Sequence, residues 1–278
     1  MYDTLRPELL TATEAQRADM ARDPVEVVTW DLFKENQLPY LEVRRPFMLG
    51  VLGDQNTGGE VYRPTLAHFV MRVAHDKRLL RRVYTQNIDG LDFKTGIPHH
   101  LLVPVHGSLG RVVCEGCKAP YPSPAFCDRL REQIKDIYNI DPAAPPSSSP
   151  IPCLSCGKPL VKPATVLYGR NLPAEFFEKK APDLQGLDLL IVAGTSLSVG
   201  PANSVAFDAP PSTVRLLVNH DQVGDIGSRR NDLFAQGECD ASLLALATEC
   251  GWLEALEGYQ DQMSAQSVAT LKAASGRH

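Results

Sequence analysis

The chain has 278 residues, a formal net charge of −5 and 44 % hydrophobic residues. This length suits one or two domains with a sizeable buried core, and the negative charge gives no overall reason to expect a nucleic-acid partner. No apolar run reaches the length of a membrane span, and the N-terminal residues lack the apolar core of a signal peptide. We therefore expect an intracellular protein of the cytoplasm or nucleus, with no membrane partner.

The first 62 residues predict helices and loops, beginning with a short helix from Thr13 to Arg22. The glycine-bearing segment Gly53–Gly59 does not match the dinucleotide fingerprint, so we expect a surface turn there. Pro64 then stands where a first helical residue would, and apolar residues follow at helical spacing. These residues are Leu66, Phe69, Val70 and Val73. The pattern predicts an amphipathic helix ending near residues 75–77.

A strand predicted at residues 79–84 stops at the polar stretch Thr85–Asp92. In an open α/β sheet, polar residues at the carboxyl end of a strand usually face the ligand crevice. A second apolar segment, residues 103–105, ends at His106, whose side chain is well suited to proton transfer near neutral pH. A plain turn at residues 87–90 and a histidine that merely ends a strand would give the same pattern, so this motif alone leaves both interpretations open.

Two Cys-x-x-Cys pairs follow, at Cys114 and Cys117 and at Cys153 and Cys156. Two such knuckles supply the four sulfur ligands of a tetrahedral zinc ion, which leaves no open position for catalysis. The alternative is four unrelated thiols. The segment between the pairs, residues 123–152, is rich in proline and serine near its end, and we expect a mobile insertion. Cys127 has no Cys-x-x-Cys mate, and we expect no role for it in the metal site.

The rest of the chain alternates predicted strands and helices. A strand at residues 165–168 ends at Gly169, and a helix can start at Pro173. The segment 188–193, apolar after its initial aspartate, predicts a parallel strand covered on both faces. A small-residue turn follows, which lets backbone groups approach a phosphate or ribose. A strand at 214–218 and a helix at 241–249, capped by Asp240, come next, and a final helix precedes a frayed tail.

The combined order of these motifs resembles the sirtuins, a family of NAD-dependent protein-lysine deacylases. The resemblance implies an α/β fold, a Rossmann-like parallel sheet with a small zinc-ribbon module. It implies NAD as co-substrate, structural Zn²⁺, and an acyl-lysine protein substrate, of which histone tails are one candidate. The products would be free lysine, nicotinamide and O-acyl-ADP-ribose.

The resemblance also assigns roles to individual residues. The implied catalytic residues are His106, as general base, with Asn87 and Asp89. The implied NAD-binding residues are Gln86, Asn87, Asp89, Gly194, Thr195, Ser196, Asn219 and Cys239, the last through its backbone. The implied zinc ligands are Cys114, Cys117, Cys153 and Cys156. The implied substrate-binding residues are Val166, Leu167, Tyr168 and Gly169.

Two departures from the sirtuin pattern stand out. Arg170 occupies a position where the family usually has glutamate, which reverses a charge beside the segment that binds substrate. The first strand, the Gly-Ala-Gly phosphate loop and the Pro-Asp-Phe-Arg segment of sirtuins are not in this sequence. A mis-set start, a truncated isoform and a partner that supplies the strand each explain this, and we favour the first.

We expect four regions: residues 1–105 as the first part of the Rossmann-like domain with a helical cofactor-loop segment, 106–170 as the zinc module, 171–255 as the second Rossmann-like part, and 256–278 as a C-terminal helix and tail. The expected function is NAD-dependent protein deacylation. The alternatives are a truncated, catalytically impaired scaffold held by structural zinc, and a zinc-ribbon nucleic-acid binder, for which the dense basic and aromatic cluster is missing.

Overall fold

The computed structural model describes residues 5–52 and 62–276, so the segment Gly53–Gly59 lies outside the described residues. The chain divides into two compact units. Unit 1 contains the described residues of segments 1–61 and 106–171, and unit 2 contains segments 62–105 and 172–278. The predicted boundaries after residues 105 and 170 fall at or beside these limits. The residues before 62, however, group with the cysteine-bearing segment and not with residues 62–105.

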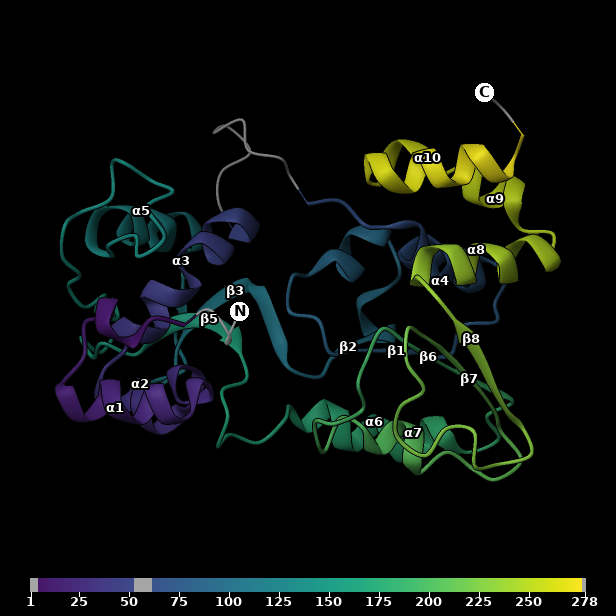
Figure 1. The fold of residues 1–278 in the computed structure, drawn as a ribbon, viewed down its shortest axis with the longest axis horizontal. Coiled ribbons are helices and arrows are strands. Elements are labelled where there is room, and N and C mark those ends of the chain that lie inside the picture. Colours follow the sequence, from purple (N-terminus) through teal and green to yellow (C-terminus); the bar gives the residue numbers. More distant parts are fainter. Residues whose placement is uncertain (1–4, 53–61, 277–278) are drawn as a thin grey trace. The chain divides into compact units, whose positions relative to one another are not determined.

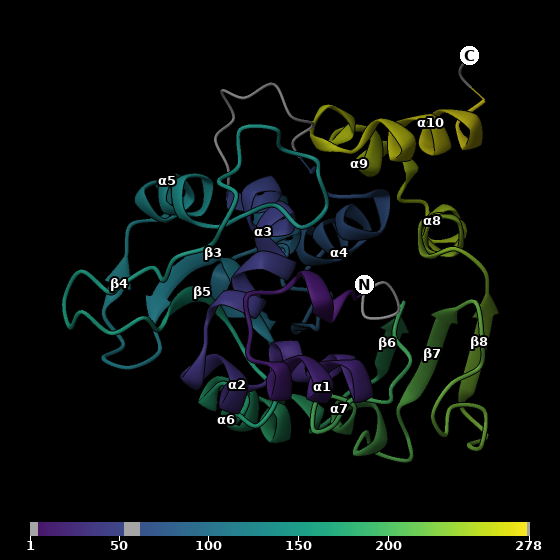
Figure 2. The same cartoon turned by 60° about the vertical axis from the view of Figure 1, so that its left-hand side comes forward.

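Unit 1 combines helices with a small antiparallel sheet. Its helices are η2 (Pro7–Leu9), α1 (Glu14–Arg22), η3 (Pro24–Val28), α2 (Trp30–Glu35), α3 (Leu38–Leu52) and α5 (Ser123–Gln133). Its strands are β3 (Gly107–Cys114), β4 (Pro120–Tyr121) and β5 (Val161–Thr165), in the order β4-β3-β5. Thr13 begins α1 as predicted, because its hydroxyl and the side chain of Gln16 form a capping box. Figure 2 shows α3 and α5 packed beside β3.

The insertion between the two cysteine pairs is held against α3 at several points. The hydroxyl of Ser148 donates to Glu42 Oε1 at 2.5 Å, and Arg45 Nη2 donates to Asp141 Oδ2 at 2.6 Å. Both Glu42 and Arg45 are buried, at 0 % and 2 % exposure. A buried charge that loses its partner is costly, so these pairs fix the insertion in place. The prediction of a mobile insertion is therefore wrong.

The strand predicted at residues 165–168 lies earlier in the chain. β5 spans Val161–Thr165 and includes Pro163, while Tyr168 forms only an isolated bridge with Thr29. Pro163 is tolerated because a strand at a sheet edge needs no donor on its outer side. The run Thr165–Tyr168, which predicted a strand, therefore contains only the last residue of β5 and the three residues that follow it.

Unit 2 has the architecture of a parallel α/β domain. Its helices are α4 (Leu66–Asp76), η5 (Leu91–Thr95), η6 (His99–Leu101), α6 (Ala174–Leu184), α7 (Ser204–Phe207), α8 (Cys239–Glu249), α9 (Leu253–Glu257), η7 (Gln260–Gln262) and α10 (Ala265–Ala274). Its strands are β1 (Val83–Thr85), β2 (Leu102–Pro104), β6 (Leu189–Ala193), β7 (Val214–Asn219) and β8 (Asp232–Gln236). All strand pairs in this unit are parallel, in the separate sheets β1-β2 and β6-β7-β8. The predicted α/β class with a parallel sheet is confirmed.

Helices cover the larger parallel sheet on both sides. In Figure 1, α6 and α7 lie on one side of β6–β8, and α4 and α8 lie on the other. One buried cluster joins Val192 and Leu217 to Ala206 of α7, and a second joins Val218 to the apolar face of α4. Alternate residues of a strand point to opposite faces, so β7 contributes to both clusters.

The strand β6 differs from its prediction. Its apolar run was expected to be covered on both faces, yet Leu189 and Ile191 are 45 % and 40 % exposed. In the part of the chain that the structure describes, β6 pairs only with β7, so it is an edge strand. Its alternate residue Val192 is buried against the α7 side. The described residues therefore cover one face of β6 and leave Leu189 and Ile191 on the other face partly exposed.

The start of α4 is also corrected. The helix begins at Leu66 and not at Pro64. Asp240 does not cap its own helix α8, but accepts a hydrogen bond from the Ala67 backbone N–H at 2.9 Å and from the buried Ser267 hydroxyl at 2.7 Å. Ser267 in turn accepts from the Leu66 N–H. Two N–H groups that a helix start leaves unpaired are thus satisfied by α8 and α10.

The strands β7 and β8 carry a buried ion pair directly across the parallel ladder. Arg215 and Asp232 are register partners, and both side chains are fully buried. The guanidinium donates to both oxygens of Asp232, at 2.8 and 2.7 Å, and to Asp225 at 2.7 Å. Arg215 thereby holds the pKa of Asp232 well below its usual range.

We predict that Arg215→Leu lowers the free energy of unfolding by about 3–5 kcal/mol, because it leaves the Asp232 carboxylate buried and unpaired. Urea denaturation followed by circular dichroism measures the loss. Arg230→Leu, at an exposed neighbouring arginine, is the matched control and should change stability by less than about 0.5 kcal/mol. Equal stability of the two variants would contradict the role of the pair.

Candidate functional site

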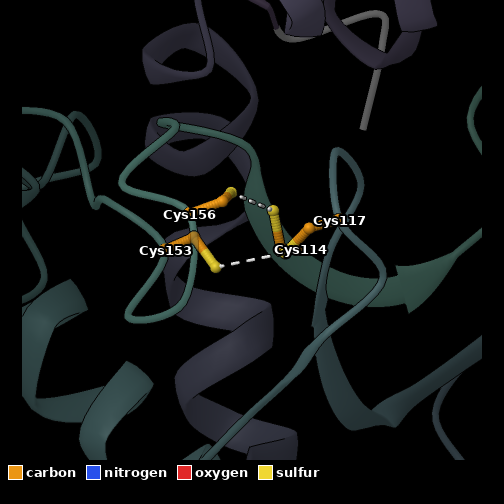
Figure 3. Close-up of side chains that lie close together, drawn as sticks. All are labelled: Cys114, Cys117, Cys153 and Cys156. Atoms are coloured by element: carbon orange, nitrogen blue, oxygen red, sulfur yellow. Dashed lines mark hydrogen bonds between the residues drawn. The ribbon is translucent and has the colours of Figure 1, made fainter.

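The four cysteines of the two Cys-x-x-Cys pairs come together in unit 1. Their sulfur atoms all lie within 4.8 Å of one another (Figure 3). The Sγ atoms of Cys114 and Cys156 are 3.7 Å apart, as are those of Cys117 and Cys153. A zinc ion with four Zn–S bonds of about 2.3 Å in a tetrahedron places its sulfurs about 3.8 Å apart. The cluster therefore fits a structural zinc ion, and the alternative of four unrelated thiols is wrong.

The local backbone favours the thiolate form of one of these cysteines, Cys153, whereas burial raises the pKa of Cys114. Cys114 ends β3, and Cys153 lies in the turn whose N–H groups face its sulfur. Hydrogen bonds from the backbone N–H groups of Cys156 and Ser155 lower the pKa of Cys153 to about 6. Cys127 is buried in α5, outside the cluster, as expected for a cysteine with no metal role. All seven cysteines are free thiols.

In unit 2, the carboxyl ends of β1, β6 and β7 bring several predicted residues together. Gln86 Nε2 donates to the Thr195 hydroxyl at 3.2 Å, and Asn219 Nδ2 donates to the Thr195 carbonyl at 3.4 Å. Gly194 has a φ of +61°, and a Cβ there would lie 3.3 Å from the sulfur of Cys239. We call the residues Gln86, Gly194, Thr195, Asn219 and Cys239 the strand-end cluster. Its polar groups and close backbone are suited to a ribose or phosphate.

Asn87 and Asp89 lie in the short loop between β1 and η5. The Asn87 N–H donates to the Thr85 hydroxyl at 3.2 Å, and Asp89 Oδ1 accepts from the Leu91 N–H at 3.0 Å. Gly90 follows with a φ of +75°, a left-handed conformation that glycine adopts without strain. Asp89 is thus held in an Asx turn. The predicted pair belongs to one compact loop of unit 2.

We predicted no role for Asp92 from the sequence, and the structure places it in η5, directly after this loop. Its side chain is 3 % exposed, and Oδ2 has no hydrogen-bond partner among the described residues. Burial raises the pKa of Asp92, while the charge of His68 and a hydrogen bond from the Thr85 hydroxyl oppose this rise. Thr85 therefore links Asp92 to the Asn87 backbone. The sequence feature that could have pointed to Asp92 is its position, as a second acidic residue three positions after Asp89.

His106 belongs to unit 1, where it directly precedes β3. Its carbonyl accepts a hydrogen bond from the Val166 N–H at 2.8 Å, which ties it to the segment predicted to bind substrate. Gly107 approaches β5 so closely that a Cβ would lie 2.1 Å from the Ala164 carbonyl oxygen. The glycine after His106 is therefore required by packing, which explains the His-Gly pair in physical terms.

The four residues predicted to bind substrate form the end of an extended segment. Tyr168 pairs through its backbone with Val28 and Trp30, at 3.1 and 2.9 Å. The Leu167 carbonyl accepts from the Arg170 N–H, so the chain turns at Gly169, which has a φ of +82°. Among the hydrogen bonds of residues 5–52 and 62–276, none uses the Leu167 N–H or the Gly169 backbone. These groups remain able to bond to a ligand.

Removing the metal tests the four-thiol cluster. Purified protein should contain a single zinc ion per chain, and chelation should unfold the antiparallel sheet of unit 1, because a structural zinc contributes folding free energy directly. Elemental analysis and circular dichroism measure both effects. Cys156→Ser should lose the zinc, whereas Cys250→Ser, at an exposed cysteine outside the cluster, should retain it. Zinc retention by Cys156→Ser would contradict the assignment.

Within the described residues, none of the helices is both long and apolar enough to cross a membrane.

The amino-acid sequence of this chain is similar to those of known NAD-dependent protein deacetylases. The chain is 34 % identical over 273 residues to the NAD-dependent protein deacetylase hst2 of Schizosaccharomyces pombe, covering 97 % of this chain and 72 % of the relative. It is 36 % identical over 197 residues to the NAD-dependent protein deacetylase sirtuin-3 of Mus musculus, covering 70 % of this chain and 54 % of that protein. It thus spans about half of the mouse protein's length and most of the yeast protein's.

A family model agrees with these relatives. The model of the Sir2 family matches residues 43–201, which is more than half of the 278-residue chain. The matched region includes the Asn87–Asp89 loop, the four-cysteine cluster and the Gly194–Ser196 turn. The chain therefore belongs to the Sir2 family, the sirtuins.

Proposed function

We propose that this protein is an NAD-dependent protein-lysine deacylase, a transferase that releases nicotinamide and O-acyl-ADP-ribose. Its family membership supports this function, and the relatives that it resembles are named NAD-dependent protein deacetylases. The observation that carries the proposal is the strand-end cluster, in which Gln86 and Asn219 converge on Thr195 at the carboxyl ends of parallel strands. Ligands of open α/β sheets bind at such ends.

The polar groups of the strand-end cluster are of the chemical types that bind NAD. The strand-end cluster offers amide and hydroxyl groups for a ribose, and the turn Gly194–Ser196 offers a close backbone approach. When bound, NAD supplies the leaving nicotinamide and the ribose that accepts the acyl group. We assign Gln86, Gly194, Thr195, Ser196, Asn219 and the backbone of Cys239 to holding it.

The chemical steps fall to three side chains. We assign to His106 the role of general base, which would take up a proton from a ribose hydroxyl when NAD and the acyl-lysine are bound. We assign to Asn87 and Asp89 the orientation of the ribose and of a water molecule. The Asx turn of Asp89 and the hydrogen bond from the Asn87 N–H to Thr85 support this role, because they hold the loop before a ligand arrives.

The acyl-lysine substrate adds to the end of the segment Val166–Gly169. Alternate residues of an extended chain point their backbone groups to opposite sides. Val166 and Tyr168 bond to His106 and to residues 28–30 on one side, so the Leu167 N–H is available on the other. A substrate backbone that bonds there extends unit 1 by strand addition. Protein substrates, with histone tails as one candidate, and an intracellular location belong to this proposal.

A second candidate function is a scaffold held by structural zinc, with weak or no NAD affinity. One observation favours it. The parallel strands of unit 2 lie in two separate sheets, β1-β2 and β6-β7-β8, and β6 presents exposed apolar side chains at an edge. A dinucleotide site normally spans a continuous parallel sheet at the point where strand order reverses. Binding of NAD therefore distinguishes the two functions.

Calorimetric titration with NAD decides between them. The deacylase function predicts saturable binding. Thr195→Val removes the hydroxyl that joins Gln86 to the turn and should weaken NAD binding by about 3- to 10-fold, the value of one hydrogen bond of about 0.5–1.5 kcal/mol. Ser212→Ala, at an exposed hydroxyl, should leave the affinity unchanged. Absence of any NAD binding would favour the scaffold.

Substitution of the general base tests the chemistry. His106→Ala should reduce NAD-dependent deacylation of an acetyl-lysine peptide by at least about 100-fold, the range of general base catalysis. Its thermal unfolding midpoint should stay close to that of the wild type, because the carbonyl contact to Val166 does not need the imidazole. His100→Ala, at an exposed histidine, is the matched control for loss of a ring. Full activity of His106→Ala would refute the assignment.

A further inference from the structure

Arg170 is placed by the turn that ends the proposed substrate segment. Its N–H donates to the Leu167 carbonyl at 3.1 Å, and Gly169 supplies the left-handed conformation that this turn requires, with a φ of +82°. The side chain therefore starts three residues beyond Leu167, whose N–H is the proposed point of substrate addition. It is 39 % exposed.

The guanidinium of Arg170 is held in position by two neighbours. It lies over the ring of Trp30, with the carbon Cζ 4.5 Å from the ring centroid. One Nη atom is 3.6 Å from Glu115 Oε2. The Trp30 backbone N–H also donates to the Tyr168 carbonyl at 2.9 Å. Trp30 thus fixes both the substrate segment and the charge beside it, which restricts the arginine to a narrow set of positions.

The charge of Arg170 is only partly balanced. Glu115 is the carboxylate nearest to it, and two lysines compete for the same group: Lys118 at 2.5 Å and the fully buried Lys162 at 3.2 Å. Three cations therefore share one carboxylate. The guanidinium has five N–H donors, and among the described residues its partners are Glu115 and the Trp30 ring. Its exposed donors are free to bind an anionic group from a ligand.

We propose that Arg170 makes this enzyme select acyl-lysine substrates that carry an acidic side chain beside the modified lysine. This inference rests on the proposed deacylase function and deepens it by naming a class of substrate. A substrate strand that adds at Leu167 approaches the turn at Gly169, and the long, partly exposed side chain of Arg170 begins at the end of that turn. An aspartate or glutamate on the substrate then meets a preorganised guanidinium, whose planar fork suits a carboxylate.

The expected size of the substrate preference follows from the partial exposure of the Arg170 side chain. Ion pairs between partly exposed side chains contribute about 0.2–1 kcal/mol, which is about a 1.5- to 5-fold change in a binding or rate constant. A zinc ion with four thiolates carries a formal charge of about −2 and lowers the local potential, but it is the same in every variant at position 170. Comparison of variants therefore isolates the contribution of Arg170.

The experiment uses three acetyl-lysine peptides that differ only in both residues next to the acetyl-lysine: aspartate, asparagine or lysine. Nicotinamide release gives kcat/KM for each, and fluorescence anisotropy of labelled peptides gives Kd without turnover. The proteins are the wild type, Arg170→Gln, Arg170→Glu and Arg170→Lys. Arg129→Gln, at an exposed arginine of α5, is the control for loss of a surface charge elsewhere.

The wild type should prefer aspartate over asparagine, and asparagine over lysine, by about 1.5- to 5-fold at each step, and added salt should reduce the preference. Arg170→Gln should lose the preference, Arg170→Glu should reverse it, and Arg129→Gln should keep it. Arg170→Lys should retain a weaker preference, because it keeps the charge but not the planar fork. A wild type that deacylates all three peptides equally would overturn the inference and leave the proposed function intact. A wild type that releases no nicotinamide from any peptide would overturn the proposed function, and the anisotropy ranking would then decide the inference separately.

Discussion

The four-sulfur cluster is the constraint on which unit 1 depends. It joins the end of β3 to the turn at Cys153–Cys156 across a separation of 36 residues between Cys117 and Cys153. The antiparallel sheet it anchors is small, with β4 only two residues long, and such a sheet has little apolar area to stabilise it alone. From this anchor, β5 leads directly into the segment that ties His106 and Trp30 together.

Much of the site could be predicted from the sequence because its signals are local. Cys-x-x-Cys spacing fixes two ligands in one turn, so the zinc site needed only the two turns to meet. Gln86, Thr195 and Asn219 each follow an apolar run, and polar residues at the carboxyl ends of parallel strands usually face a ligand. The positions of these three residues after apolar runs were therefore enough to predict that they lie close together.

The remainder depended on contacts between residues far apart in the chain. The insertion at 123–152 has the composition of a mobile loop, yet the buried charges of Glu42 and Arg45, about 100 residues earlier, hold it in place. Asp240 looked like a cap for its own helix but serves the start of α4, 173 residues away. The apolar run of β6 gave no sign that this strand would pair only with β7 among the described residues. Composition and periodicity do not report such partners.

The long separation between the two cysteine pairs has a consequence for biosynthesis. When Cys114 and Cys117 leave the ribosome, the chain offers a metal only two of its four sulfurs, and the other two emerge after the whole insertion has been made. The charges on α3 are present earlier and are ready to receive Asp141 and Ser148 as these residues appear. Docking of the insertion on α3 can thus precede metal capture, so that the second knuckle arrives close to the first and the metal completes a sheet that is already partly assembled.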